Sequence, residues 1–501
     1  MERLAAAPFI LAYLLSTAVA AGGVVTHAGD AADMYRLAAA LGADRALMWA
    51  APFDPCGEPW IGVLCDDVGR VTSIRAKGVG LNGSLPSDLG PLSELVYLDV
   101  GHRLAGALPR IRLPRLETLR LDGNRFTEVP RGFFVGLRAL RFFSASNNTS
   151  LKEWELPRHD LRRLTNLTTF DVNNACLIGS VAHFLGGDDD DGAFPILARV
   201  SLANNMLSGS LPEKFGTEKL EYLDLSHNRL SGPIKSVAAL VNMVQLRMNG
   251  NEFTGPLPDF TSFQALRVLS VAANRLTGMV PAALAQLNGL RVVSLSGNLL
   301  QGPLPEFATT VEDDVEAAAI NGSFCRVDWG PCDPRVDALL SIAAAFGYPE
   351  SLAATWRRND PCARWAGVYC DDTAAAAGGG GSREITRLNL CRMGLNGTMD
   401  PAFGSLQSVV AILLSGNHIS GVIPQSVAEL PSLRLLDVAD NVLEGTVPGF
   451  RGDVEIWADG NPKLNMTSMT TRCSPSNISE KAFHAATCVV VAILAAVLSM
   501  F

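Results

Sequence analysis

Residues 220–234 read LEYLDLSHNRLSGPI, with apolar side chains at fixed intervals around one asparagine, Asn228. The same pattern returns as MVQLRMNGNEFTGPLP at 243–258, LRVLSVAANRLTGMVP at 266–281 and LRVVSLSGNLLQGPLP at 290–305. Successive asparagines stand at positions 205, 228, 251, 274 and 298, which are 23, 23, 23 and 24 residues apart. A fixed period of this length indicates a repeat architecture.

The period and the leucine spacing are those of the leucine-rich repeat. Each unit predicts one short strand, in which side chains alternate between an inward and an outward face. One unit cannot bury its leucines, so neighbouring units must stack into a solenoid with a continuous core. The recurrent asparagine follows the strand, where its amide can pair backbone groups of the adjacent turn. We therefore interpret the following asparagines as structural: Asn124, Asn205, Asn228, Asn251, Asn274, Asn298, Asn417 and Asn441.

A cysteine-containing element occurs twice, as FDPCGEPWIGVLCDD from Phe53 and as NDPCARWAGVYCDD from Asn359. Amphipathic helical sequence precedes each copy. The end of a solenoid exposes apolar core and needs a cap, so two such elements predict two stacks. The predicted fold is an α/β leucine-rich-repeat solenoid with two repeat blocks separated by a non-repeat island.

This organisation divides the chain into seven parts. They are a signal peptide at 1–20, an N-terminal cap at 21–70, a first block of about ten repeats at 71–308, an island with the second cap at 309–384, a second block of about three repeats at 385–464, a linker at 465–484 and an apolar tail at 485–501.

The N-terminus predicts secretion, because an early arginine is followed by an apolar run and then by small residues. In an oxidising compartment, close cysteine pairs are expected to be disulfides. The three close pairs are Cys56/Cys65, Cys325/Cys332 and Cys362/Cys370, whereas Cys176, Cys391, Cys473 and Cys488 have no near partner. Eight glycosylation sequons fit the same route, at Asn82, Asn147, Asn148, Asn166, Asn321, Asn396, Asn465 and Asn477. Asn147 and Asn148 overlap, so we do not expect both to carry a glycan.

Many units carry Leu-x-Gly-x-Leu/Ile/Val-Pro after the asparagine, as in LSGSLP at 207 and ISGVIP at 419. This variant resembles plant extracellular leucine-rich repeats. Ten units, a cysteine-containing island, a repeated W-x-G-V-x-C cap and three more units resemble the ectodomain of the plant transmembrane-kinase (TMK) receptor-like kinases. The resemblance implies a plant-type repeat fold and a role in cell-surface auxin signalling, with receptor-like kinases or secreted auxin-binding proteins as partners. The kinase motifs of that family are not found before Phe501, so kinase activity is not carried over.

The last seventeen residues, AATCVVVAILAAVLSMF, are apolar or small. A membrane-spanning helix needs about 20 such residues, usually with a basic cytoplasmic flank. Small residues, a short polar spacer and a terminal apolar tail also fit a GPI signal. Both alternatives, GPI anchor and membrane helix, place the solenoid on the extracellular face of the plasma membrane, and secretion to the apoplast is the third.

The outward residues of the first block mix aromatic and charged side chains, which suits binding of a protein or peptide. The candidate partner-binding residues are Arg120, Asp122, Phe142, Asp171, Tyr222, Asp224 and Arg247. The island is an equal candidate, since a break in a solenoid forms a crevice. A net charge of −9 without a basic cluster argues against a nucleic-acid partner.

We find no catalytic motif and no metal-ligand spacing, so we expect neither enzymatic activity, nor a cofactor, nor a metal site. The run GGDDDDG at 186–192 lacks the spaced ligands of a calcium loop and predicts a solvated acidic loop. The alternative function is a secreted inhibitor or decoy of the polygalacturonase-inhibitor type. The sequence names no ligand.

Overall fold

The computed structural model describes residues 24–57, 60–77, 80–187, 194–314, 324–326, 330–371 and 383–465. The predicted signal peptide at 1–20, the apolar tail at 485–501, and the sequons Asn321 and Asn477 lie outside these residues. The chain forms two compact units, residues 1–143 and 144–501, and each is described by itself. Among the described residues, no helix combines the length and the apolar character needed to span a membrane.

The first unit contains a helical cap followed by stacked strands. Its elements are α1 (Ala28–Leu41), α2 (Ala43–Ala46), β1 (Val63–Cys65), β2 (Val71–Ala76), β3 (Tyr97–Val100), β4 (Ala105–Ala107), β5 (Thr118–Arg120) and β6 (Arg125–Glu128), with β7 (Phe142–Ser144) at its boundary. Strand β1 pairs antiparallel with β2, and β2, β3 and β5 then follow as parallel neighbours. Leu98 and Leu119 alternate with outward residues and are fully buried, as the repeat pattern predicts.

The first cap is closed by a disulfide between Cys56 and Cys65, whose Cα atoms are 5.7 Å apart. Inside it, the rings of Trp49 and Trp60 stack at 5.5 Å between centroids. The end of α1 is set by Gly42, whose left-handed φ of 64° lets its N–H bond the last carbonyls of the helix.

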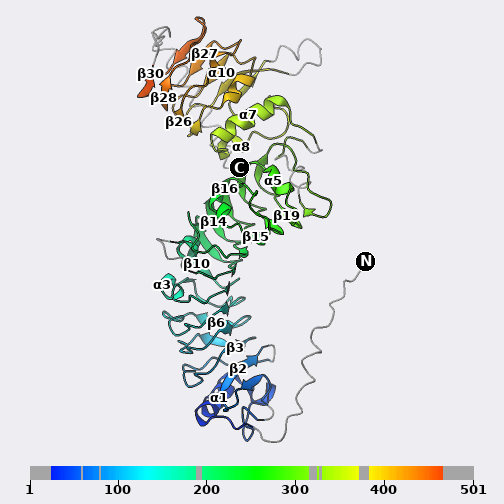
Figure 1. Cartoon of the computed structure of the whole chain (residues 1–501), viewed down its shortest axis with the longest axis vertical. Coiled ribbons are helices and arrows are strands. Elements are labelled where there is room, and N and C mark those ends of the chain that lie inside the picture. Colours follow the sequence, from blue (N-terminus) through cyan, green and yellow to red (C-terminus); the bar gives the residue numbers. More distant parts are fainter. Residues whose placement is uncertain are drawn as a thin grey trace. The chain divides into compact units, whose positions relative to one another are not determined.

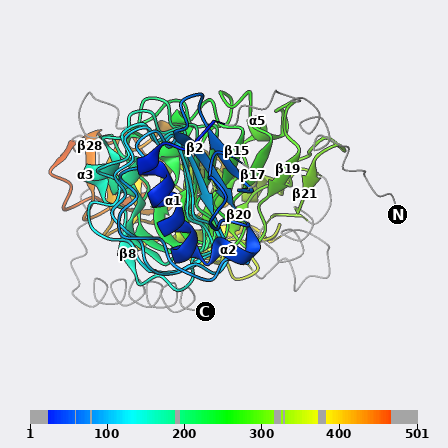
Figure 2. The same cartoon turned by 90° about the horizontal axis from the view of Figure 1, so that it is seen from below.

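The first part of the second unit continues the repeat. Its elements are β8 (Trp154–Glu155), α3 (Arg158–Leu161), β9 (Thr169–Asp171), β10 (Leu177–Ser180), α4 (Val181–Leu185), β11 (Arg199–Ser201), β12 (Met206–Gly209), β13 (Tyr222–Asp224), β14 (Arg229–Pro233), η1 (Lys235–Ala239), β15 (Gln245–Arg247), β16 (Glu252–Pro256), β17 (Val268–Ser270), β18 (Arg275–Met279), α5 (Ala282–Ala285), β19 (Val292–Ser294), β20 (Leu299–Gln301) and β21 (Glu312–Asp313). The odd-numbered strands β9 to β21 form one parallel sheet, part of which is seen in Figure 2. The strands β8, β10, β12, β14, β16, β18 and β20 form a second sheet.

The asparagine ladder is confirmed. The side-chain amide of Asn251 donates to the carbonyls of Leu225 (2.9 Å) and Met248 (3.1 Å), and its Oδ1 accepts the N–H of Leu230 (3.0 Å). Each such residue therefore joins its own turn to the preceding one and pairs backbone groups that the stack removes from water. The other seven predicted asparagines do the same, and Asn461 extends the series.

The parallel ladder of the first block runs beyond residue 308, where the sequence predicts its end. Strand β21 pairs with β19, within the segment assigned to the island. The carboxylate of Asp314 accepts the Oγ–H of Ser294 (2.7 Å) and the N–H of Leu295 (2.6 Å), whereas in the preceding turn the N–H of Val271 donates to a backbone carbonyl of the next strand. One carboxylate thus accepts hydrogen bonds from polar groups at the end of the stack, although the segment that contains it lacks the repeat sequence.

The second cap follows this end of the first block (Figure 1). It contains α7 (Pro334–Ala345), α8 (Glu350–Ala353) and β22 (Val368–Cys370), and two disulfides join Cys325 to Cys332 and Cys362 to Cys370. Asp333 caps α7 through the N–H of Arg335 (2.9 Å), and Pro334 occupies the first turn.

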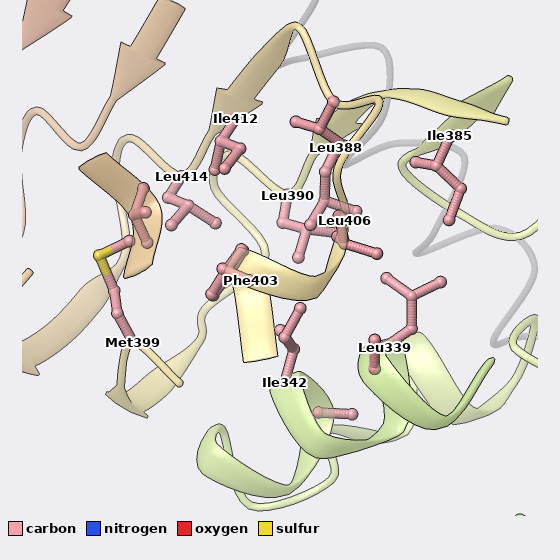
Figure 3. Packing of buried hydrophobic residues seen from close by; sticks show 14 of the residues in the cluster. Leu339, Ile342, Ile385, Leu388, Leu390, Met399, Phe403, Leu406, Ile412 and Leu414 are labelled. Atoms are coloured by element: carbon pink, nitrogen blue, oxygen red, sulfur yellow. The ribbon is translucent and has the colours of Figure 1, made fainter. Parts of the chain in front are cut away.

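The second block contains β23 (Ile385–Asn389), β24 (Asn396–Thr398), η2 (Pro401–Ser405), β25 (Ala411–Leu413), β26 (His418–Gly421), α10 (Gln425–Ala428), β27 (Leu435–Asp437), β28 (Val442–Thr446), β29 (Glu455–Trp457) and β30 (Lys463–Asn465). Its core is continuous with α7. Figure 3 shows Leu339 and Ile342 of that helix directed toward Phe403 and Leu406, with Leu390 behind them. These residues are nearly or fully buried, so α7 closes the near end of the block.

The junction between the first block and the second cap is packed at several residues, although the sequence suggests a crevice there. The side-chain amide of Gln301 donates to the carbonyl of Trp356 (2.7 Å), and the hydroxyl of Thr277 donates to the carbonyl of Tyr348 (2.8 Å). Both bonds are shielded from water, because Gln301 and Thr277 are buried. At these positions the island binds the first block instead of opening a cleft.

Candidate partner-binding faces

The first unit presents an outward row that we call the first face: Arg75, Tyr97, Asp99, Arg120 and Phe142. The guanidinium carbon of Arg75 lies 4.7 Å from the ring centroid of Tyr97, and that of Arg120 lies 4.3 Å from the ring centroid of Phe142. Both distances are typical of cation–π contacts. The register of β3 and β5 sets Asp99 opposite Arg120. Two cations, two aromatic rings and one carboxylate therefore share one surface.

Asp99 is the residue of the first face whose carboxyl has a shifted pKa and weak hydrogen bonding. Burial raises the pKa of its carboxyl above the ordinary value, and the positive charges of Lys77 and Arg120 offset only part of that effect. The hydroxyl of Tyr97 donates to Asp99 Oδ2 at 3.4 Å, which is a long bond. Arg120 Nε is buried without a hydrogen-bond partner among the described residues. The face therefore holds polar groups whose bonding capacity is only partly used.

The second unit presents a related row, the second face: Arg199, Tyr222, Asp224 and Arg247. The guanidinium carbon of Arg199 lies 3.5 Å from the ring centroid of Tyr222, whose hydroxyl donates to Asp224 Oδ2 at 3.4 Å. Asp224 stands in register with Arg247 on the next strand. Unlike Asp99, Asp224 also accepts the N–H (3.0 Å) and Oγ–H (2.6 Å) of Ser226. This carboxylate is therefore fixed by its own repeat.

Asp171 lies two strands before Tyr222 in the same sheet and belongs to a closed polar network. Its Oδ1 accepts the hydroxyl of Ser146 (2.8 Å) and the amide of Asn173 (2.6 Å). Asn173 in turn accepts the hydroxyl of Ser201 at 3.0 Å. Toward the end of the block, the outward residues of β17 and β19 are Val268, Ser270, Val292 and Ser294, so the charged and aromatic character ends there.

The structure groups the predicted residues as two sets. Arg120 and Phe142 are in contact, Asp122 follows β5 in the first unit, and Tyr222, Asp224 and Arg247 lie together in the second. The sequence analysis missed Arg75, Tyr97, Asp99 and Arg199. The repeated tripeptide Tyr-Leu-Asp at 97–99 and 222–224 could have indicated the first two of the missed positions in the first unit, Tyr97 and Asp99.

The described sequons differ in access. Asn82, Asn147, Asn166, Asn396 and Asn465 are exposed. Asn148 is fully buried, and its side-chain nitrogen, to which a glycan would attach, donates to the carbonyl of Ala145 at 2.8 Å. The prediction of a glycan at Asn148 therefore conflicts with the fold. Its position, 24 residues after Asn124, marks it as a ladder residue.

Two of the cysteines without a near partner are described. Cys176 is free and half-buried, whereas Cys391 is fully buried and disulfide-bonded. Within the described ranges, no group of three or more His, Cys, Asp or Glu side chains could hold a metal ion. The side chains of the two faces make ionic, aromatic and hydrogen-bonding contacts.

Comparison with known proteins shows which families these features resemble. The Leucine rich repeat family matches residues 383–443 and 219–239, and the Leucine rich repeat N-terminal domain matches both caps, at 30–66 and 332–371. The receptor-like kinase TMK2 of Arabidopsis thaliana is 35% identical over 365 residues, covering 71% of this chain and 39% of the relative. This chain is a leucine-rich-repeat protein similar to the TMK receptor-like kinases.

One further relative and one solved structure are also similar to this chain. The receptor protein kinase WSS1 of Oryza sativa subsp. japonica is 37% identical over 447 residues, which cover 79% of this chain and 42% of the relative. The chain thus spans about two fifths of the length of these two kinases. The ectodomain of the Arabidopsis thaliana receptor kinase GASSHO1/SCHENGEN3, solved with CASPARIAN STRIP INTEGRITY FACTOR 2, is 21% identical with a TM-score of 0.47, covering 87% of this chain and 47% of that one.

Proposed function

We propose that this chain is a recognition module of a plant cell-surface receptor, and that its first and second faces bind a protein or peptide. The repeated arrangement of arginine, tyrosine and aspartate on outward strand positions carries this proposal. Tyrosine and arginine are the side chains that most often dominate binding energy at protein interfaces. Here each tyrosine is held by a neighbouring arginine, which reduces the side-chain entropy that binding would cost.

The TMK resemblance supports a narrower form of the proposal. In that form, the partner is a receptor-like kinase or a secreted auxin-binding protein, and the apolar tail at 485–501 attaches the chain to the plasma membrane. Phosphatidylinositol-specific phospholipase C applied to intact expressing cells separates the two kinds of attachment. Release into the medium is the result expected for a GPI anchor, and retention is the result expected for a membrane helix.

The main experiment compares matched face variants of the full chain expressed in plant cells. Partners are crosslinked at the cell surface, isolated with the wild-type chain and quantified for Arg75→Ala/Tyr97→Ala and for Arg199→Ala/Tyr222→Ala. Truncating an interface anchor costs about 2 kcal/mol or more, so recovery of the partner should fall at least about tenfold for the face that it uses. The control is Val268→Ala/Ser270→Ala on the featureless β17.

Two outcomes would contradict the proposal. One is equal recovery of every partner by all variants. The other is inhibition of polygalacturonase by the wild-type chain in a pectin-hydrolysis assay, because a secreted inhibitor is the rival function.

Binding at the first face should also depend on pH. A partner that brings a cation to Asp99 binds the ionised carboxylate more tightly than the protonated carboxyl. At pH values near the raised pKa of Asp99, part of the carboxyl is protonated and binding must release that proton. The affinity should therefore rise as the pH increases through this pKa, and it should level off at higher pH where Asp99 is already ionised. Asp99→Asn should remove the dependence, whereas Asp224→Asn should leave it in place.

A further inference from the structure

Two connections of the first unit contain a basic segment that the net charge of the whole chain conceals. Residues 108–117 join β4 to β5, and residues 129–141 join β6 to β7. Together they contain six arginines, no lysine and one acid, Glu117, whereas the whole chain carries a net charge of −9. The expectation that the chain lacks a basic cluster therefore does not hold for this segment, and an anionic partner has to be considered.

The two connections lie side by side in adjacent turns of the stack. Arg110 Nε donates to the carbonyl of Arg131 at 3.1 Å. Further along, a Cβ on Gly136 would lie 2.9 Å from the Cα of Arg112, so the two backbones approach closely there as well. Neighbouring turns are about 5 Å apart. The arginines of both connections therefore share one surface.

Buried apolar residues hold both connections against the core and leave the arginines outside. Arg112 is exposed between Ile111 and Leu113, which are nearly or fully buried. In the next turn, Arg138 is exposed directly after the fully buried Leu137. The alternation therefore fixes the backbone beneath each cation without using the guanidinium group.

Two of the six arginines are neutralised within the first unit. Arg115 is paired with Glu94, and Arg141 Nε lies 3.5 Å from Glu117 Oε2. The other four, which we call the basic surface, are exposed and make no ion pair with a described residue: Arg110, Arg112, Arg131 and Arg138. Like charges held close together repel one another, so a bound anion would relieve a cost that the free protein carries.

The composition of the basic surface favours a hydrated polymer with repeated carboxylates. A guanidinium group binds a carboxylate through two parallel N–H···O bonds, and all four cations are arginine. A protein interface usually has an apolar or aromatic centre. In these two described connections, Val135 is the one large apolar side chain that is exposed. An acidic protein is therefore a poorer match than an anionic polysaccharide.

We propose that the basic surface binds a linear polysaccharide of uronic acids through its carboxylates. Each arginine pairs with one carboxylate of the polymer, and the counterions of both are released into the solvent. The first face lies on the strands β2, β3, β5 and β7, whereas the basic surface lies in the connections between strands. The polymer thus holds the chain without using the residues proposed to bind a protein.

Binding of the purified full chain to immobilised polygalacturonate, in calcium-free buffer, tests the proposal. The test variant replaces all four arginines of the basic surface with glutamine. The matched control removes four positive charges from exposed positions of the second unit, as Lys214→Gln, Lys219→Gln, Lys235→Gln and Arg267→Gln. We expect the affinity to fall at least about tenfold in the test variant and less than about twofold in the control. Equal affinities of these two variants, or no binding by the wild type, would overturn the proposal.

A milder variant guards against a loss of folding in the fourfold substitution. Arg112→Gln/Arg138→Gln leaves the bond between Arg110 and Arg131 intact and removes half of the charge. It should bind about threefold more weakly than the wild type, since half of the tenfold effect in free energy is lost. Wild-type affinity in this variant, with unchanged thermal unfolding, would count against the basic surface.

Two other polymers establish which chemistry is recognised. Fully methyl-esterified polygalacturonate has the same sugar chain without charges and should not bind. Polyglutamate presents carboxylates on a flexible chain that loses more conformational entropy, so it should bind more weakly at equal carboxylate concentration. Binding of the esterified polymer would show that carboxylates are not recognised. Equal or tighter binding of polyglutamate would assign the surface to an acidic protein, and either result would overturn the proposal.

The salt dependence provides an independent readout. Raising sodium chloride from about 50 to about 200 mM should weaken binding of the wild type at least about tenfold, because counterion release drives the association. The test variant should lose most of this dependence. Binding of the wild type that is insensitive to salt would contradict an ionic contact.

Discussion

The two caps share one sequence element but have different surroundings. In each, two tryptophans stack, at 5.5 Å for Trp49 and Trp60 and at 5.4 Å for Trp356 and Trp365. In each, the indole N–H of the first tryptophan donates to a backbone carbonyl that follows the second, at 3.0 and 2.9 Å. The same pair of tryptophans thus builds the same local structure twice, although eleven residues separate them in the first cap and nine in the second.

The helices of the two caps are buried differently. The buried residues of α1 include two aspartates, Asp30 and Asp33, whereas those of α7 are all apolar. Asp30 is paired with Arg70 and with the N–H of Val71. Helix α7 packs on the second block, and its cap also bonds the first block through Trp356 and Tyr348. One copy closes a stack, and the other joins two stacks.

The largest expected effect comes from the first tryptophan of each cap. Trp49→Ala and Trp356→Ala each remove a fully buried ring, which costs about 3–5 kcal/mol. Hydrogen exchange should rise around β1 and β2 for Trp49→Ala. For Trp356→Ala it should rise both in the second block and at β18 and β20. A rise confined to the second block would contradict the joining role of this cap.

A second pair of variants tests the shared turn before β1 and β22. A Cβ on Gly62 would lie 2.1 Å from the carbonyl oxygen of Arg75, and one on Gly367 would lie 2.3 Å from that of Asn389. Both glycines have positive φ, so alanine at either should lower the free energy of unfolding by about 3 kcal/mol. Gly394→Ala is the control, because it has a similar φ and open space around it. The free energy of unfolding is measured by urea denaturation. Equal losses of stability at all three glycines would show that the closeness of the neighbouring carbonyl to Gly62 and Gly367 is unimportant.

Two hydrogen bonds join the second cap to the first block, and each can be removed by a single substitution. Gln301→Leu leaves the carbonyl of Trp356 unpaired in a buried position, which costs about 1–3 kcal/mol. Thr277→Val removes the bond to Tyr348 with little change of volume and should cost about 1 kcal/mol. Thermal unfolding of the full chain measures both losses. Unchanged unfolding in Gln301→Leu would mean that the junction adds no stability.

The smallest effect is expected for the ion pair between Arg275 and Glu350. The Arg275 side chain is half exposed, so water screens the attraction and Arg275→Ala should cost less than about 1 kcal/mol. Any loss should fade at high salt, unlike that of Gln301→Leu. A loss independent of salt would point to packing by the arginine stem.

Much of this fold follows from local sequence. The recurrence of leucine at a period of 23 or 24 residues determines which side chains are inward, and the asparagine of each unit then lies where two turns meet. The close cysteine pairs are equally local, because seven to nine residues separate the partners. The duplicated cap could be recognised for the same reason.

Other features depend on contacts between distant residues. No repeat pattern marks Asp314 as the residue that ends the first stack, since only its position beside β19 gives it that role. The placement of Arg75 and Arg199 over tyrosine rings also depends on the neighbouring strand. Likewise, Asn148 satisfies the glycosylation tripeptide but is buried by the turns around it.

The stacking unit, its strands, its ladder and its two caps could be predicted from the amino-acid sequence, because each follows from spacing within one or two turns of the chain. Tertiary structure alone decided that the second cap joins two blocks and that Gln301 meets Trp356, 55 residues away. It also decided which outward charges face an aromatic ring. Spacing along the chain specifies which face a side chain takes, but the partner across that face depends on how the turns pack.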